Sequence, residues 1–477
     1  MTPAPAASRA LLPASRVVEA LGAPAAAPAA SAFVGVDTDS RAVRTGSLFV
    51  GVRGERFDGG AFAAEAVRAG AAAAVAEREP PRDLPPGAGW WVVPGGLDAL
   101  QRLARVHRAA APARVVCVTG SNGKTGTKEL VGSVLARRFE VARTRGNLNN
   151  QVGLPLSLLD LEPRHEWGVF EIATSRPGEI ARLTELCRPE IGVITNVAAS
   201  HLEGLGSLEG VLREKTALAA GLGRDGALVY GGDDAPLREA VRAFPCRRVS
   251  FGTGPGNDVH PDAWGLDDEG RPVFRVAGLG EVRLRLVGLP SLLNALAAVA
   301  VGRLAGLDAA EIRAGLEAAA PLPLRLEVSR AAGVTVIQDC YNANPDSMRR
   351  GVETLRALGG RGARVAVLGA MRELGREAEA LHYGLGRDLA ADPLDLLVVV
   401  GEETVPLARG YQSATDAPVH FVEAGAGVAE LLRTHVAAPA AVLFKASRGP
   451  ALETAAEAYL AALRGEAAGP EPGGNGG

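Results

Sequence analysis

The sequence predicts an α/β protein of three domains, two of them built around mostly parallel sheets. From residue 115 onward, short apolar runs alternate with helical patterns, as in VVCVT, WGVFEIA, IGVITNV and ALVYGG. That alternation is typical of a parallel sheet flanked by helices. A second set of such units follows a proline-punctuated stretch near residue 320: VTVIQD, ARVAVLG, DLLVVVG and AVLFKAS. The length of 477 residues suits about three domains.

The first domain is expected over residues 1–111, where short strands mix with alanine-rich helices, with a strand at 47–52 and helices at 61–69 and 97–109. The second is expected over 112–322 and contains the first set of βα units. The third, over 323–477, is expected to be a smaller, Rossmann-like doubly wound domain. Its tail, 465–477, is rich in glycine and proline and is predicted to be disordered.

Composition excludes several classes of function. The net charge is -3 and the chain has no long basic run, so nucleic acid binding is not expected. The four cysteines form no CxxC pair, which argues against a zinc knuckle or disulfide framework and fits a reducing cytoplasm. The N-terminus lacks the pattern of a signal peptide. The most apolar window, 284–307, is interrupted by Pro290, Asn294 and Arg303 and predicts a buried helix, with no membrane insertion.

The segment TGSNGKTGTKE, residues 119–129, has the parts of a phosphate-binding loop. It follows an apolar strand and opens a helical pattern, and its glycines let backbone N–H groups turn toward an anion at a helix N-terminus. The strict Walker A pattern fails, because Val118 stands where its first glycine belongs. A glycine-rich βα turn with a surface lysine is the alternative, which the strand–loop–helix context disfavours. Nothing in the sequence explains Gly126 in the first helical turn.

Polar residues end several of the apolar runs, and in parallel sheets ligands bind at the carboxyl ends of the strands. These ends carry Gly120, Glu171, the segment 196–201, Asp339 and the segment 445–448. A carboxylate at such an end can face a nucleotide's phosphates. Mg²⁺ prefers oxygen ligands, so a histidine such as His201 is more often structural, and Lys215 by spacing alone is a solvated helix lysine.

Several separated motifs resemble those of the Mur ligases, the ATP-dependent amide-bond ligases of peptidoglycan synthesis. The resemblance rests on TGSNGKT, NLNNQVGLPLSLL from Asn147, EIATSRPGEI from Glu171, NVAASHLEGLGSLEGVLREK from Asn196 and DCYNANPDSMRRGVETL from Asp339, with VLGAMRELG and KASRG beyond them. It covers nearly the whole chain. YNANPDSM is similar to the motif of the member that adds D-alanyl-D-alanine to UDP-N-acetylmuramoyl-tripeptide. DTDSRAVRTGSLFVGVRGERFDG resembles that member's uridine-nucleotide-binding domain.

The resemblance implies an N-terminal α/β UDP-sugar-binding domain, a central P-loop ATPase domain with a parallel sheet, and a C-terminal Rossmann-like domain. It implies that the tripeptide carboxylate is phosphorylated by ATP and that the resulting acyl phosphate is attacked by the D-alanyl-D-alanine amine. ATP and Mg²⁺ are then required, and both other substrates are small molecules. The setting would be a bacterial cytoplasm, and the protein is expected to be a monomer.

The matching motifs also imply roles for single residues. ATP would be bound by Gly120, Ser121, Asn122, Gly123, Lys124, Thr125, Gly126, Asn294, Asp339, Tyr341 and Asn342. The expected Mg²⁺ ligands are Thr125, Glu171, His201 and a carbamylated Lys215. The catalytic residues would be Lys124, His201 and Lys215. The UDP-substrate would lie near Ser40, Arg41, Asp58 and Asn149, and the peptide end near Ser447 and Arg448.

The chain departs from the family pattern at Pro290, Ser291, Leu324 and Ala370. These departures concern the expected adenine contact and details around the site, and they leave the phosphate and metal residues intact. Two rival functions stay open beside the main one. A sister ligase would add diaminopimelate or lysine to the UDP-muramoyl-dipeptide, and an inactive homologue would bind the nucleotide without turnover.

Overall fold

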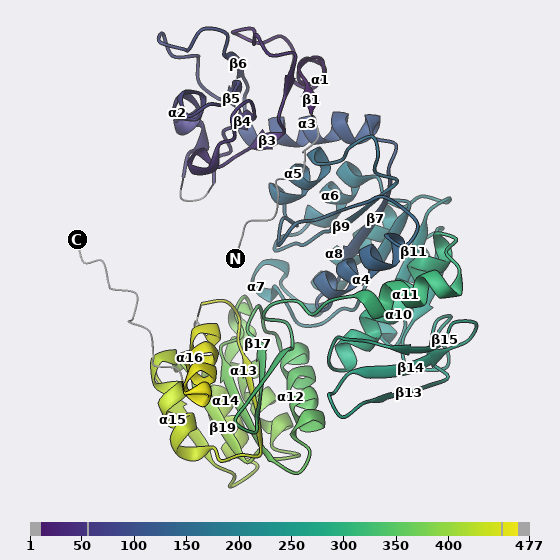
Figure 1. Cartoon of the computed structure of the whole chain (residues 1–477), viewed down its shortest axis with the longest axis vertical. Helices are drawn as coiled ribbons and strands as arrows, with labels where there is room; N and C mark the ends of the chain where they lie inside the picture. The colour runs from purple at the N-terminus through teal and green to yellow at the C-terminus, as the bar shows by residue number, and fades with distance from the viewer. Residues whose placement is uncertain (1–10, 55–56, 450–451, 466–477) are drawn as a thin grey trace, which may run out of the picture.

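The computed structural model describes residues 11–54, 57–449 and 452–465, and the tail predicted to be disordered lies outside them except for Gly465. Three α/β domains follow one another along the chain, with the N-terminal domain at the top of the view, the central domain at the right and the C-terminal domain at the lower left (Figure 1). The predicted fold class is confirmed.

The N-terminal domain is built on a parallel sheet in the order β3-β4-β5-β6. Its strands are β3 Val36–Asp37, β4 Leu48–Val50, β5 Ala73–Ala76 and β6 Gly89–Val92, beside an antiparallel pair of β1 Leu12–Pro13 and β2 Ala32–Phe33. The helices are α1 Ala14–Leu21, α2 Ala63–Arg68 and α3 Gly96–Ala110. Both helices predicted here exist, whereas the predicted strand at 47–52 is shorter.

One hydrophobic core joins the N-terminal and central domains. Leu100 and Leu103 of α3 pack in the same buried cluster as Leu158 of α5 and Leu183 of α6. Helix α3 therefore fixes the N-terminal sheet against the central domain.

The central domain contains a six-stranded parallel sheet in the order β12-β11-β10-β7-β9-β8. Its strands are β7 Arg114–Thr119, β8 Val141–Arg143, β9 Trp167–Glu171, β10 Ile191–Ile194, β11 Ala227–Gly231 and β12 Arg247–Phe251. Its helices are α4 Lys124–Leu135, α5 Gly153–Leu159, α6 Glu179–Cys187, α7 Leu202–Leu205, α8 Leu208–Ala220, α9 Ala235–Ala240, α10 Leu289–Leu304 and α11 Ala309–Ala318. Helices α4, α10 and α11 share a core on one face, and α5, α6, α8 and α9 contribute to the core on the other.

Two features of this domain differ from the sequence prediction. The apolar window 284–307 becomes a helix only over α10, because Gly288 turns the chain at φ 83 and Pro290 sits in the first helical turn, where its missing N–H costs nothing. No described helix is both long and apolar enough to cross a bilayer. An antiparallel sheet that the sequence did not predict precedes α10, with strands β13 Ala263–Leu266, β14 Pro272–Val276 and β15 Gly280–Arg283.

The C-terminal domain has a sheet in the order β16-β17-β21-β18-β19-β20, parallel except for β16. The strands are β16 Glu327–Ala331, β17 Val334–Asp339, β18 Ala363–Gly369, β19 Leu396–Val400, β20 Val419–Val422 and β21 Ala440–Lys445. Helices α12 Pro345–Gly359, α13 Ala378–Leu389 and α14 Val405–Gln412 cover one face, and α15 Val428–His435 and α16 Leu452–Arg464 cover the other. All four strands predicted here exist.

The described residues also contain short 3-10 helices: η1 Ser40–Ala42, η2 Gly59–Phe62, η3 Val241–Ala243, η4 Gly375–Glu377, η5 Glu402–Thr404 and η6 Gly425–Gly427.

The start of α12 shows how the local sequence determines where a helix begins. The Asn344 side chain accepts a hydrogen bond from the Ser347 N–H at 2.9 Å, and Pro345 occupies the first helical position. NPDS thus begins this helix at the carboxyl end of β17.

Candidate active site

A cavity of about 1410 Å³ lies between the central and C-terminal domains. It gathers most residues that the sequence singled out: Ser121, Asn122, Gly123, Lys124, Thr125, Gly126, Asn149, Glu171, His201, Asn294, Asp339, Tyr341 and Asn342. The structure places the other predicted residues outside its lining: Gly120, Lys215, Ser40, Arg41, Asp58, Ser447 and Arg448. The carboxyl ends of strands in two sheets therefore face one space.

The phosphate loop connects β7 to α4 and is held by the segment that follows β10. Gly120 has φ 141, and a Cβ there would lie 1.9 Å from Thr195 Oγ1, so no side chain fits. The Thr195 hydroxyl donates to the Asn122 carbonyl at 2.5 Å, and Ser121 Oγ accepts from the Ala198 N–H at 2.9 Å. The neighbouring strand end thus fixes the shape of the loop.

Lys124 opens α4, and its ammonium lies over its own loop. Nζ donates to the carbonyls of Gly120 at 2.9 Å and Ser121 at 3.1 Å. Burial lowers the pKa of Lys124, and the negative charge of Glu171 opposes that shift. A cation held here beside a helix N-terminus is suited to neutralise phosphate oxygens.

Glu171 ends β9 and is almost fully buried, with 2% of its surface exposed. Its Oε2 accepts from the Thr125 hydroxyl at 2.7 Å, and its Oε1 accepts from Asn149 Nδ2 at 2.8 Å. Asn149, which the resemblance placed beside the UDP-substrate, therefore orients the Glu171 carboxylate. Glu171 and Thr125 thus place side by side two oxygen atoms of the kind that bind metal ions.

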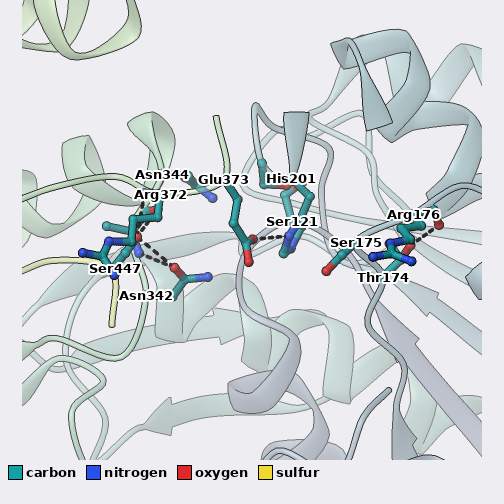
Figure 2. A network of polar contacts seen from close by, with 12 residues as sticks. Ser121, Thr174, Ser175, Arg176, His201, Asn342, Asn344, Arg372, Glu373 and Ser447 are labelled. Carbon is teal, nitrogen blue, oxygen red and sulfur yellow. Dashed lines mark hydrogen bonds and ion pairs between the residues drawn. The ribbon is translucent and has the colours of Figure 1, made fainter. Parts of the chain in front are cut away.

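His201 precedes α7 in a left-handed conformation, with φ 53. Its Nδ1 is buried and lacks a hydrogen bond of standard geometry among the described residues, but Glu373 Oε2 of the C-terminal domain lies 2.5 Å away (Figure 2). This contact lowers the pKa of Glu373, against the smaller effect of burial. Glu373 was not among the predicted site residues, although it lies in the motif VLGAMRELG that contributes to the family resemblance.

Lys215 lies in α8 and is completely buried. Within the described part of the chain its Nζ has no hydrogen-bond partner, which rules out the solvated helix lysine that spacing suggested. Burial lowers the pKa of Lys215 well below its usual range, and the charge of Lys124 adds to this effect. A buried polar group without a hydrogen-bond partner is rare in folded proteins and calls for a physical explanation.

The donor set fits a magnesium ion that also takes oxygens from a nucleotide. Among the described residues, no group of three or more His, Cys, Asp and Glu side chains could hold a metal ion by itself. The Glu171 carboxylate and Thr125 hydroxyl are hard oxygen donors, and Mg²⁺ is commonly held by one or two carboxylates with substrate phosphates.

Asn294 of α10 lies against the first turn of α4. Its Oδ1 accepts from the Thr127 hydroxyl at 3.0 Å. A Cβ on Gly126 would lie 2.4 Å from Asn294 Nδ2, and one on Gly123 would lie 2.5 Å from Oδ1. The close approach explains Gly126, for which the sequence offered no reason.

The C-terminal wall of the cavity carries a buried ion pair and a stacked tyrosine. Lys445 Nζ lies 2.5 Å from Asp339 Oδ2 and donates to the Asn342 carbonyl at 3.2 Å. The Arg325 guanidinium carbon lies 3.9 Å from the Tyr341 ring centroid. Lys445 and Arg325 were not among the predicted site residues, although a lysine that ends an apolar strand was a usable signal.

Ser447 and Arg448 contact residues of this wall, although neither lines the cavity. The Ser447 hydroxyl donates to Asn342 Oδ1 at 3.2 Å and accepts from the Arg372 N–H at 3.0 Å, so it ties two loops together (Figure 2). The Arg448 guanidinium carbon lies 4.8 Å from the ring centroid of Tyr341.

Ser40, Arg41 and Asp58 lie on the N-terminal domain, away from the cavity lining. Ser40 and Arg41 form the start of η1, where Arg41 is exposed and pairs with Asp39 at 2.8 Å. Asp58 caps η2 by accepting from the Gly60 N–H at 3.1 Å. The structure therefore divides the predicted residues between two separate regions.

Three family descriptions match successive parts of the chain: "Mur ligase family, catalytic domain" over residues 32–108, "Mur ligase middle domain" over 118–302 and "Mur ligase, glutamate ligase domain" over 324–448. A UDP-N-acetylmuramoyl-tripeptide–D-alanyl-D-alanine ligase of Bacillus subtilis is 35% identical over 423 residues, covering 88% of this chain and 91% of the relative.

Solved structures agree with the sequence comparison. MurF from Acinetobacter baumannii superposes with a TM-score of 0.85 at 32% identity, over 95% of this chain and all (100%) of that one. MurF ligase from Thermotoga maritima in complex with ADP superposes with a TM-score of 0.80 at 32% identity, over 90% and 98% of the two chains. With the phosphate loop, Glu171 and His201 assembled on this fold, the chain belongs to the Mur ligase family.

Proposed function

We infer that this enzyme joins D-alanyl-D-alanine to UDP-N-acetylmuramoyl-tripeptide at the expense of ATP, in the synthesis of peptidoglycan precursors. Relatives that bear the name of this activity align with most of the chain at 33–35% identity. The observation that carries the inference in the structure is the cavity where the phosphate loop, Glu171 and His201 face Asp339 and Tyr341 of the next domain.

The reaction must activate a carboxylate, which is anionic and has no good leaving group. The tripeptide carboxylate attacks the γ-phosphate of ATP in line, forming an acyl phosphate and releasing ADP. The D-alanyl-D-alanine amine then attacks the acyl carbon, and phosphate leaves as the amide forms. Phosphoryl transfer depends mainly on positioning and on charge neutralisation.

We propose that Lys124 and the loop N–H groups hold the ATP phosphates. Thr125, Glu171 and His201 would hold Mg²⁺, which when bound neutralises charge on the phosphate oxygens. Asp339, Tyr341 and Asn342 would close over the nucleotide, and Asn294 would lie at its adenine. Acyl phosphates hydrolyse, so closure of the cavity between two domains would exclude water from the intermediate.

We propose that Lys215 is carbamylated and serves as a further metal ligand. What supports this is the complete burial of Lys215 and, among the described residues, the lack of a hydrogen-bond partner for its Nζ, since a carbamate would replace a buried amine with an anion able to bind the metal. The Lys215→Ala variant should lose activity and recover part of it when short carboxylates are added. Full activity of this variant without rescue would contradict the metal role.

We propose that the UDP-substrate is bound by the N-terminal domain near Ser40, Arg41 and Asp58, with Asn149 toward the cavity. The peptide end would then approach Ser447 and Arg448. The separation of these groups supports the assignment, because the UDP-tripeptide is long and one end of it must reach the γ-phosphate.

The proposed domain limits are 1–111, 112–322 and 323–477. They fall in connections between sheets, since α3 ends at Ala110 before β7, and α11 ends at Ala318 before β16. We further propose that the enzyme is a cytoplasmic monomer. Light scattering of the purified protein would test the monomer.

The deciding experiment is phosphate release with ATP, Mg²⁺ and D-alanyl-D-alanine, using UDP-muramoyl-tripeptides that end in diaminopimelate or in lysine. Release that requires both the dipeptide and one tripeptide is expected. Release with the UDP-muramoyl-dipeptide and free diaminopimelate or lysine would instead indicate the sister ligase, which the named relatives do not favour. Nucleotide binding without release on any acceptor would indicate an inactive homologue.

A further inference from the structure

The contact between His201 and Glu373 joins two residues with unusual backbones. His201 has φ 53 and Glu373 has φ 63, both in the left-handed region that side chains other than glycine rarely adopt. They come from different domains, and Glu373 Oε2 lies 2.5 Å from Nδ1 of His201, which lines the cavity (Figure 2). Such backbones persist only where the surrounding structure holds them in place.

The surrounding packing is an interface between domains. Leu202 and Leu205 of α7 are buried in the same hydrophobic cluster as Met371 and Leu374 of the C-terminal domain. In Figure 1, α7 lies at the junction of these two domains. The helix that follows His201 is therefore part of the C-terminal domain's core, although it belongs to the central domain in sequence.

The backbone adds a second attachment. The Glu203 N–H donates to the Glu373 carbonyl at 3.1 Å, and a Cβ on Gly375 would lie 3.1 Å from Glu203 Cα. The loop that carries Glu373 thus lies directly on α7. The position of this loop therefore determines where the Glu373 carboxylate meets the His201 imidazole.

We propose that Glu373 is a positioning residue, which orients His201 toward the metal from the neighbouring domain. Histidines that bind metals usually direct their second ring nitrogen to a carboxylate or carbonyl, which fixes the tautomer and the ring plane. With Nδ1 at Glu373, the Nε2 atom of His201 is left for the metal. The metal site is then complete only when the C-terminal domain is docked. This inference rests on the proposed metal role of His201.

The test measures Mn²⁺ binding to the full chain in the presence of ADP. Electron paramagnetic resonance detects the Mn²⁺ that remains free. Mn²⁺ replaces Mg²⁺ as the visible probe, and no turnover is needed. Glu373→Gln removes the charge and keeps the shape, and it should weaken Mn²⁺ binding roughly tenfold or more. Because Glu373 is half exposed, with 52% of its side chain accessible, the variant should keep the wild-type melting temperature.

Glu377→Gln is the matched control, since it removes the same charge four residues away, at the end of the 3-10 helix η4. It should leave Mn²⁺ affinity unchanged. Wild-type or tighter binding in Glu373→Gln would overturn the proposal, and so would equal weakening in both variants. His201→Ala separates the two levels of inference. If it leaves Mn²⁺ affinity unchanged, the metal role of His201 fails; if it alone weakens binding, only the role of Glu373 fails.

Discussion

At the scale of single residues, the proposed function makes Lys124 the side chain whose loss should slow phosphate transfer most directly. Lys124→Ala should lower the rate of phosphate release about a hundredfold or more, because one preorganised charge on the transferred group is lost. The melting temperature should stay near the wild-type value, since the two hydrogen bonds of Nζ go only to its own loop.

Arg137→Ala is the control for that experiment, because Arg137 is exposed beyond the end of α4. Both variants would be assayed for phosphate release and for melting temperature. Near-normal release in Lys124→Ala would reject the assignment of the phosphate loop.

His382 makes stability depend on pH. It is buried, Nε2 accepts from the Met371 N–H at 3.0 Å, and Nδ1 lies 2.7 Å from the Ala378 carbonyl. Burial lowers the pKa of His382 from its usual 6.5. At pH values between the lowered pKa of His382 in the folded protein and its pKa in the unfolded chain, the unfolded chain binds more protons. The free energy of unfolding therefore falls as the pH decreases below about 6.5.

Urea unfolding followed by circular dichroism, at about pH 7.5 and about pH 5.5, would measure this loss on either side of the unfolded pKa. In His382→Gln the loss between the two pH values should be smaller than in the wild type. His435→Gln, at an exposed position, should retain the wild-type loss. An identical pH dependence in all three proteins would contradict the role of His382.

At the scale of elements, the packing of α10 on α4 explains a glycine in a helix. Gly126→Ala gains about 1 kcal/mol of helix propensity but places a Cβ against Asn294. Overpacking of this kind typically costs about 1–3 kcal/mol, so the single variant should be destabilised or bind ADP more weakly.

A double-mutant cycle separates these two effects. In the Asn294→Ala background the clash is absent, and Gly126→Ala should then be neutral or stabilising. Thermal unfolding and ADP titration of the four proteins would measure the coupling. If Gly126→Ala has the same effect in both backgrounds, the contact with Asn294 is not the reason for the glycine.

At the scale of the whole molecule, Asn122 couples the phosphate loop to the C-terminal domain. Its Nδ2 donates to Asp346 Oδ2 at 2.8 Å, and its Oδ1 accepts from Asn344 Nδ2 at 2.8 Å. Each such bond contributes about 0.5–1.5 kcal/mol. Asn122→Ala should therefore favour undocked conformations, with a larger radius of gyration by small-angle X-ray scattering and a higher KM for ATP.

Glu353→Gln serves as the control for docking, because Glu353 is exposed on the same helix, α12, whose start contacts Asn122. Its radius of gyration should match that of the wild type. An unchanged radius and KM in Asn122→Ala would show that these hydrogen bonds do not govern docking.

The sequence by itself determined the fold class, the glycine-rich turn and helix start at 119–129 and the strand ends that carry polar groups. These follow from local periodicity, glycine placement and the shared edge of parallel strands. The antiparallel sheet before α10 escaped prediction because its short strands are partly exposed and lack a long apolar run.

Only the tertiary structure decided which distant groups meet. It placed Glu373 at His201 and Asn294 at Gly126, pairs separated by many residues that no local pattern relates. It also buried Lys215, whose spacing suggested a solvated face. Burial and contacts between domains arise from how complete elements pack, and packing depends on the whole chain.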